Sequence, residues 1–268
     1  RYDRRARRWG LGGIGMSVVR LEWLRLWRTY RLLVLVVVFA FFGLLGPLTA
    51  AYLPEIISLA SQSEDLGAAI ELPEPVPVDG IAQFIGNISQ LGLIAVAAVA
   101  ALALAVDARP GLAAFYRTRQ PAARSWILPR WAATSLAAGA AWTVGLIAAV
   151  YETVVLIGPL PVGGMVAGWA AWLLYLAFAV AVVAVAAGIV RSTVAVTVVS
   201  VGLLIVLAIV GLIPQVGDWL PSHLVGAPAA LAEQAGEPTD YLGAAGVTVA
   251  ATAALLWLAA ALVRRREL

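Results

Sequence analysis

The chain has 268 residues, of which 62% are hydrophobic and only 12% are charged, with a formal net charge of +3. About a quarter of the residues of a soluble domain are charged, so this composition excludes a soluble globular protein and indicates one that uses lipid as its solvent. Cysteine and lysine are both absent, which excludes disulfides, thiolate catalysis, Schiff-base chemistry and an ordinary P-loop, so that any ATP must be bound by another chain.

Six apolar segments are long enough to cross a membrane as helices, which takes roughly 20 residues each. They are residues 32–52, 85–106, 129–151, 166–188, 194–213 and 242–263. The sequence therefore predicts an all-α polytopic membrane protein. Residues 1–31 form a basic arm and an amphipathic elbow helix, and residues 32–268 form a transmembrane domain of six helices.

The elbow helix is predicted over residues 17–31, after a basic, glycine-rich arm. One helical face carries apolar side chains: Val19, Trp23, Leu26, Trp27 and Tyr30. We expect Glu22, Arg25 and Arg28 to point away from that face, so that the helix lies flat at the membrane boundary. It is either a simple lipid anchor or a lever that joins the first span to a cytoplasmic component.

Polar side chains are rare within the predicted spans. In the second span, Gln83, Asn87 and Gln90 lie at helical spacing and are expected to share one face. Such residues bind neighbouring helices or line a polar cavity. Glu152, near the outer end of the third span, either reaches the surface or lies deeper with a functional role. We take these four residues as candidates for a substrate pathway.

The arginines predict the orientation of the chain. Nine precede the first span, five lie between spans 2 and 3, one lies between spans 4 and 5, and three follow span 6. The loops on the other side carry no arginine and eleven of the fifteen acidic residues. Positively charged loops stay in the cytoplasm, so the sequence predicts a multi-pass protein of the cell membrane with both termini inside.

The segment 107–130 carries the five arginines between spans 2 and 3. Proline and glycine interrupt it, and we expect two short helices with a break at Pro121, the second running into span 3. A longer loop before the last span is predicted to form short external helices. Its single histidine, His223, has no cysteine or paired acidic residues beside it, so no metal site is expected.

The segment 107–130 resembles the first cytoplasmic loop of the ABC-2 type permeases, the membrane subunits of a class of bacterial ABC exporters. That loop typically reads acid, three residues, glycine, an apolar stretch, "TxPVSR" and a final basic residue. In this chain these places are occupied, in order, by Asp107, Gly111, "TRQPAAR" at 118–124 and Arg130. The elbow helix, the six spans and the long loop before span 6 are also similar. The departures are Asp for the usual Glu, Leu112 for a usual Thr, and one inserted residue, Gln120.

The resemblance implies that the elbow helix and this loop dock on a separate ATPase. The residues that it assigns to this coupling are Asp107, Gly111, Arg117, Arg119, Pro121, Arg124 and Arg130, with Glu22, Arg25 and Arg28. It further implies two ABC ATPase subunits, a second permease subunit of the same or a related kind, and ATP and Mg held by the ATPase rather than by this chain. Membrane lipids are expected contacts, and nucleic acid is not.

These features predict the permease subunit of an ATP-driven exporter, itself not an enzyme. The nearly uncharged spans favour an apolar or amphiphilic cargo. Two alternatives stay open: a membrane-embedded enzyme that modifies lipids, and a non-transporting membrane anchor or assembly partner. An enzyme would need clustered acidic or histidine side chains, whereas the acidic residues on the cytoplasmic side are scattered.

Overall fold

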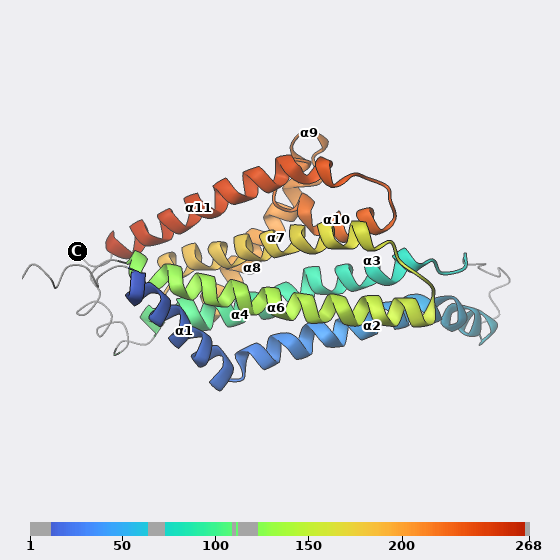
Figure 1. The fold of residues 1–268 in the computed structure, drawn as a ribbon, viewed down its shortest axis with the longest axis horizontal. Coiled ribbons are helices and arrows are strands. Elements are labelled where there is room, and N and C mark those ends of the chain that lie inside the picture. Colours follow the sequence, from blue (N-terminus) through green and yellow to red (C-terminus); the bar gives the residue numbers. More distant parts are fainter. Residues whose placement is uncertain (1–11, 64–72, 109–110, 112–122, 266–268) are drawn as a thin grey trace, which may run out of the picture.

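The computed structural model describes residues 12–63, 73–108, 111 and 123–265. Within these residues all regular structure is helical, with no strand (Figure 1). Six helical segments are long and apolar enough to cross a membrane. The predicted all-α class with six transmembrane helices is therefore confirmed.

The helices are as follows in chain order: α1 (Gly12–Arg28), α2 (Arg31–Ser63), α3 (Pro77–Asn87), the π-helix η2 (Ile88–Gly92), α4 (Leu93–Leu104), the 3-10 turn η3 (Val106–Ala108), α6 (Arg124–Leu156), α7 (Val162–Ile189), α8 (Thr193–Val210), α9 (Pro214–Gly217), α10 (His223–Ala232), the 3-10 turn η4 (Pro238–Tyr241) and α11 (Leu242–Arg265). The second span is made of α3, η2 and α4 together. Each span overlaps its predicted segment, and the short helices expected before the last span are α9, α10 and η4.

Helix α7 forms the centre of the bundle. It packs against α4, α6, α8, α10 and α11, and Trp172, Leu176 and Val180 on it are fully buried. Figure 1 shows α1, the start of α6 and the C-terminal part of α11 at one end of the molecule, and α10 with the start of α3 toward the other. We call these the α1 end and the α10 end.

Glycines allow α2 and α6 to approach closely. A Cβ atom on Gly43 would clash with the carbonyl oxygen of Gly145, and one on Gly145 would lie 2.7 Å from the carbonyl oxygen of Phe39. On the next turn of α2, a Cβ atom on Gly46 would lie 2.7 Å from the backbone nitrogen of Phe84 in α3. Small residues serve this purpose in membrane helices, where close backbone packing replaces the hydrophobic effect.

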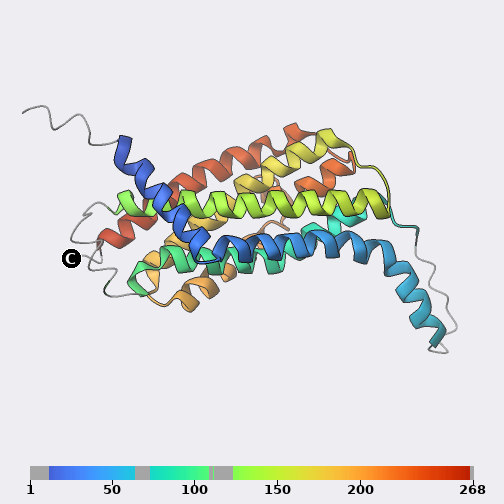
Figure 2. The same cartoon turned by 60° about the horizontal axis from the view of Figure 1, so that its bottom comes forward.

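Two prolines lie inside α2, Pro47 and Pro54. Each removes a backbone hydrogen bond and pushes against the preceding turn, which bends a helix. The C-terminal part of α2 turns away from the other helices, as Figure 2 shows. Only the portion of α2 before this bend belongs to the packed bundle.

Helix α1 is separated from α2 by a sharp break. Tyr30 has a φ of 57°, a conformation that a tyrosine rarely adopts, and the chain changes direction there (Figure 2). Helix α1 packs against α6 and α2. Its buried residues include both Leu26 and Glu22, so Glu22 lies on the same buried side as Leu26, a residue of the predicted apolar face, and not opposite it. The reason is a partner on α6, described next.

Candidate functional site

A buried ion pair joins α1 to α6 at the α1 end. Nε of Arg130 donates a hydrogen bond of 3.0 Å to Oε1 of Glu22, and the two side chains are 1% and 9% exposed. A second arginine, Arg25, lies 3.5 Å from the other carboxylate oxygen. The carboxylate of Glu22 is thus held between two guanidinium groups, one in its own helix and one in the third span.

The position of Arg130 follows from the helix that carries it. Helix α6 begins at Arg124 and runs without a break through Pro129 into the membrane span. Trp126 lies one turn before Arg130, and its ring centroid is 5.4 Å from the guanidinium carbon, a cation–π distance. A guanidinium group that is buried to this extent requires a partner such as the carboxylate of Glu22. The pair therefore fixes α1 to the first part of α6.

Of the ten predicted coupling residues, the structure brings three together, Glu22, Arg25 and Arg130. Arg28 and Arg124 are exposed. Asp107 has its backbone in the turn η3, and Gly111 is a helical, exposed residue. Arg117, Arg119 and Pro121 lie outside the described residues, as does the expected break between two short helices.

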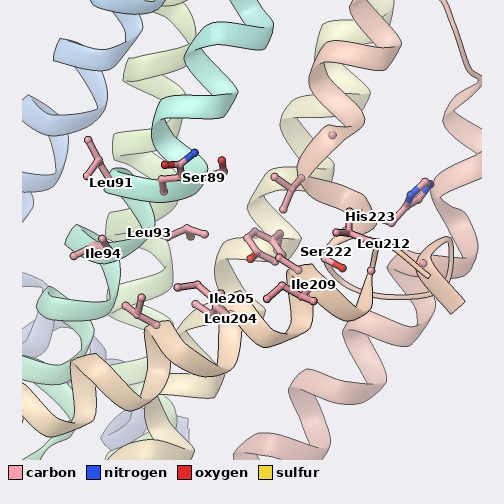
Figure 3. A pocket seen from close by; sticks show the side chains of 18 residues that line it. Ser89, Leu91, Leu93, Ile94, Leu204, Ile205, Ile209, Leu212, Ser222 and His223 are labelled. Atoms are coloured by element: carbon pink, nitrogen blue, oxygen red, sulfur yellow. The ribbon is translucent and has the colours of Figure 1, made fainter. Parts of the chain in front are cut away.

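A large pocket opens between the second, fourth and fifth spans. Its volume is about 740 Å³, within the range of sites that take a drug-sized molecule. Figure 3 shows Leu93 and Ile94 facing Leu204 and Ile205 at one side, and Ser222 with His223 at the other. The exposed side chains of Leu91, Ile94, Ile205, Ile209 and Leu212 are among those that line it, so the pocket reaches the surface of the bundle that faces lipid.

The π-helix η2 forms one wall of this pocket. The backbone N–H of Leu93 bonds to the carbonyl of Ile88, five residues earlier, instead of four as in an α-helix. A π-turn adds a residue to the turn and is often found at functional sites. Here it presents Ser89, Gln90 and Leu91 to the pocket.

A column of aromatic rings supports the opposite wall. Phe84 stacks on Trp142 with centroids 5.5 Å apart, and Trp142 stacks on Trp172 at 4.8 Å. Trp172 meets Tyr175 edge to face at 5.8 Å, and Tyr175 lines the pocket. The indole of Trp172 donates a 2.8 Å hydrogen bond to the carbonyl of Val225 in α10. The column thus ties α3, α6, α7 and α10 into one rigid wall.

The four predicted pathway residues are not brought together. Gln90 lines the pocket, whereas Gln83 and Asn87 do not, because the π-turn that follows Asn87 interrupts the helical period on which their shared face was predicted. Glu152 is half-buried near the α10 end of α6. It does not line the pocket either.

Sequence reasoning missed most of the polar residues of the pocket. Ser89, Tyr175 and Ser222 line it together with Gln90 and His223. Tyr175 is the one that the sequence signals, as a side chain with a hydroxyl group in the middle of an apolar span. The ring of His223 stacks on Tyr241 at 4.8 Å, and its Nδ1 atom lies 3.9 Å from Asp218. Within the described residues, no group of three or more acidic or histidine side chains could hold a metal ion.

These features define the class of the protein, a polytopic α-helical membrane protein with six spanning helices. Over 210 residues the chain is 25% identical to YxlG, an uncharacterized transmembrane protein of Bacillus subtilis strain 168, and the match covers 78% of this chain and 81% of YxlG. No protein-family model matches the chain, and no solved structure does. The similarity to YxlG agrees with the membrane assignment.

Proposed function

We propose that this protein is the membrane-spanning permease subunit of an ATP-driven ABC exporter. In this proposal a separate ATPase subunit hydrolyses ATP and acts on the cytoplasmic face of the chain. Two ATPases and two permease subunits make up the complex. The cargo is apolar or amphiphilic and occupies the pocket between the second, fourth and fifth spans.

The observation that carries the proposal is the buried contact between Glu22 and Arg130. An ATPase that pushes on the cytoplasmic face needs a stiff connection to the spans. The ion pair fixes α1 to α6, and α6 begins directly after the segment 112–122 that contains Arg117 and Arg119. A displacement of that loop therefore moves α1 and α6 as one unit, and α1 leads into the first span across the break at Tyr30.

The pocket supports a transport role over a simple anchor. A membrane anchor needs only lipid-facing helices, whereas this bundle holds an opening of about 740 Å³ with polar groups along an apolar lining. A lipid-modifying enzyme would need a nucleophile or a general base in such a place. The lining holds serine hydroxyls and His223, but the hydroxyl of Ser222 donates its hydrogen bond to the carbonyl of Leu207, and the imidazole of His223 stacks on Tyr241.

The test is purification of the tagged full-length chain in mild detergent from its native cells. We expect an ABC ATPase to co-purify and to hydrolyse ATP. Changing Arg117, Arg119 and Arg124 together to glutamate should reduce the recovered ATPase to about a tenth or less, because interfacial charges that lose their partners bind far more weakly.

The control variant is Arg191→Glu, which changes an exposed arginine in the turn between the fourth and fifth spans. It should leave ATPase recovery unchanged. Full recovery of the ATPase with the triple variant would remove the docking assignment. Purification of the intact chain without any ATPase would overturn the proposed function as a whole.

A further inference from the structure

We infer that the pocket between the second, fourth and fifth spans binds a neutral amphiphile with a single hydrocarbon chain. This inference rests on the proposed function and names the class of its cargo. Three properties of the pocket support it: the mixed polarity of the lining, the lack of Asp, Glu and Arg among the described residues that line it, and its opening toward lipid.

The lining of the pocket combines aliphatic and polar side chains. Most of it is aliphatic and includes Leu93, Ile94, Val201 and Leu204. Ser89, Gln90 and Tyr175 add polar groups from the second and fourth spans, and Ser222 and His223 add others after α9. An amphiphile can therefore place its chain against the aliphatic side chains and its head group against these polar groups.

The polar groups of the lining are neutral hydrogen-bonding groups. Ser89 and Gln90 come from the π-turn and Tyr175 comes from α7, where that residue is 2% exposed. Tyr175 belongs to a wall of the pocket. Hydroxyl and amide groups in such a lining favour a ligand that supplies a hydrogen-bonding oxygen or nitrogen.

The lining offers little charge complementarity to an ionic head group. No Asp, Glu or Arg is among the described residues that line the pocket. Asp218, which lies beside His223, has a side chain that is 77% exposed, so it faces water and not the pocket. A cationic head group would be removed from water without an opposite charge, and an anionic one would find only the imidazole of His223 among the described lining residues, which is unfavourable in an apolar site. The neutral head groups that remain are hydroxyls, carbonyls and amides.

The volume limits the ligand to one chain. A pocket of about 740 Å³ takes a single drug-sized molecule, and a two-chain phospholipid is larger than that. Because the exposed side chains of Leu91, Ile94 and Ile205 form the edge of the opening, the ligand reaches the pocket sideways between η2 and α8.

The experiment measures binding of tritiated monooleoylglycerol to the purified full-length chain in detergent micelles. Two competitors carry a similar C18 monounsaturated chain with a charged head: oleoyl lysophosphatidic acid and oleyltrimethylammonium. We expect saturable binding of the neutral probe and at least tenfold weaker competition by both charged amphiphiles. Equal or stronger competition by either one would overturn the neutral class.

Three variants locate the site. Ile205→Trp fills the pocket and should abolish saturable binding, whereas Val206→Trp, on the next residue of α8 and outside the lining, should leave it unchanged. Gln90→Leu should weaken binding about tenfold, the effect of one lost hydrogen bond. Full binding by the Ile205→Trp protein, or equal loss in the Val206→Trp protein, would overturn the assignment to this pocket.

The outcome is separable from that of the proposed function, because the binding assay needs no ATPase. Neutral-probe binding that is sensitive to Ile205→Trp, in a chain that recruits no ATPase, would retain this inference and overturn the proposed function. An ATPase complex whose permease chain binds no monooleoylglycerol would retain the proposed function and overturn this inference.

Discussion

The side chains of Glu22 and Arg130 are 108 positions apart in the chain and 3.0 Å apart in space. Each charge is almost completely removed from water. In such a pair, the attraction between the charges opposes the cost of dehydrating them, and removal of one partner is strongly destabilising. The pair therefore constrains the position of α1 relative to α6.

We predict that Glu22→Ala lowers the free energy of unfolding by about 3 kcal/mol, because Arg130 then stays buried without that carboxylate. Arg28→Ala, on the same helix but exposed, should change stability by no more than about 0.5 kcal/mol. Unfolding followed by tryptophan fluorescence in increasing denaturant measures both. The double variant Glu22→Leu, Arg130→Met should recover most of the loss, since it removes both charges. A Glu22→Ala protein as stable as the unmodified chain would show that the pair does not hold α1 in place.

At the scale of the helices, two features decide the architecture. The glycines of α2 and α6 set the distance between the first and third spans, since Gly43 and Gly145 face each other across the contact. The π-turn η2 divides the second span, so that α3 packs with its apolar face in the aromatic column while Ser89 and Gln90 face the pocket. A regular α-helix would not present both sets of side chains in these directions.

Gly145→Ala is expected to destabilise the protein by about 2 kcal/mol, because the new methyl group would press on the backbone of Phe39 and force α2 and α6 apart. The matched substitution Gly202→Ala lies in the fifth span, where a methyl group would meet no atom within 4 Å. It should cause no loss, since alanine favours helix more than glycine does. Denaturant unfolding of the two variants side by side measures the difference, and equal stabilities would contradict the close-packing account.

At the scale of the whole molecule, the arrangement separates two regions. The Glu22–Arg130 contact joins α1 to the start of α6, whereas the pocket lies between the second, fourth and fifth spans and the residues around the start of α10. Figure 1 shows α1 and α10 toward opposite ends of the molecule. Most arginines of the described residues lie at the α1 end, on α1, at the start of α6 and at the C-terminal end of α11. By the positive-inside rule, an end of the molecule that carries most of the arginines is expected to face the cytoplasm.

The orientation can be tested directly because the chain contains no cysteine. We predict that a cysteine at exposed residue Glu233, after α10, reacts in intact cells with a maleimide that cannot cross membranes. A cysteine at exposed residue Arg191, between α7 and α8, should react only after the cells are made permeable. The positive-inside rule gives this expectation, and the reverse labelling pattern would place both termini outside.

The sequence by itself determined the class of the protein and the number and approximate positions of the spans. These depend on local composition, because a run of about 20 apolar residues is stable in lipid as a helix whatever its neighbours are. The resemblance to the ABC-2 type permeases also gave Arg130 and Glu22 as candidates. Their pairing was not, because residue spacing within one helix carries no information about a partner on another.

Only the tertiary structure decided which polar residues meet. The face predicted for Gln83, Asn87 and Gln90 assumes 3.6 residues per turn, and the π-turn after Asn87 breaks that period. Tyr175 and Ser222 enter one pocket only because α7 and α10 pack together through Trp172 and Val225. The length of an apolar run is a property of one segment. A pocket, in contrast, is a space left between packed helices. Its shape depends on the side chains of residues that are far apart in the sequence.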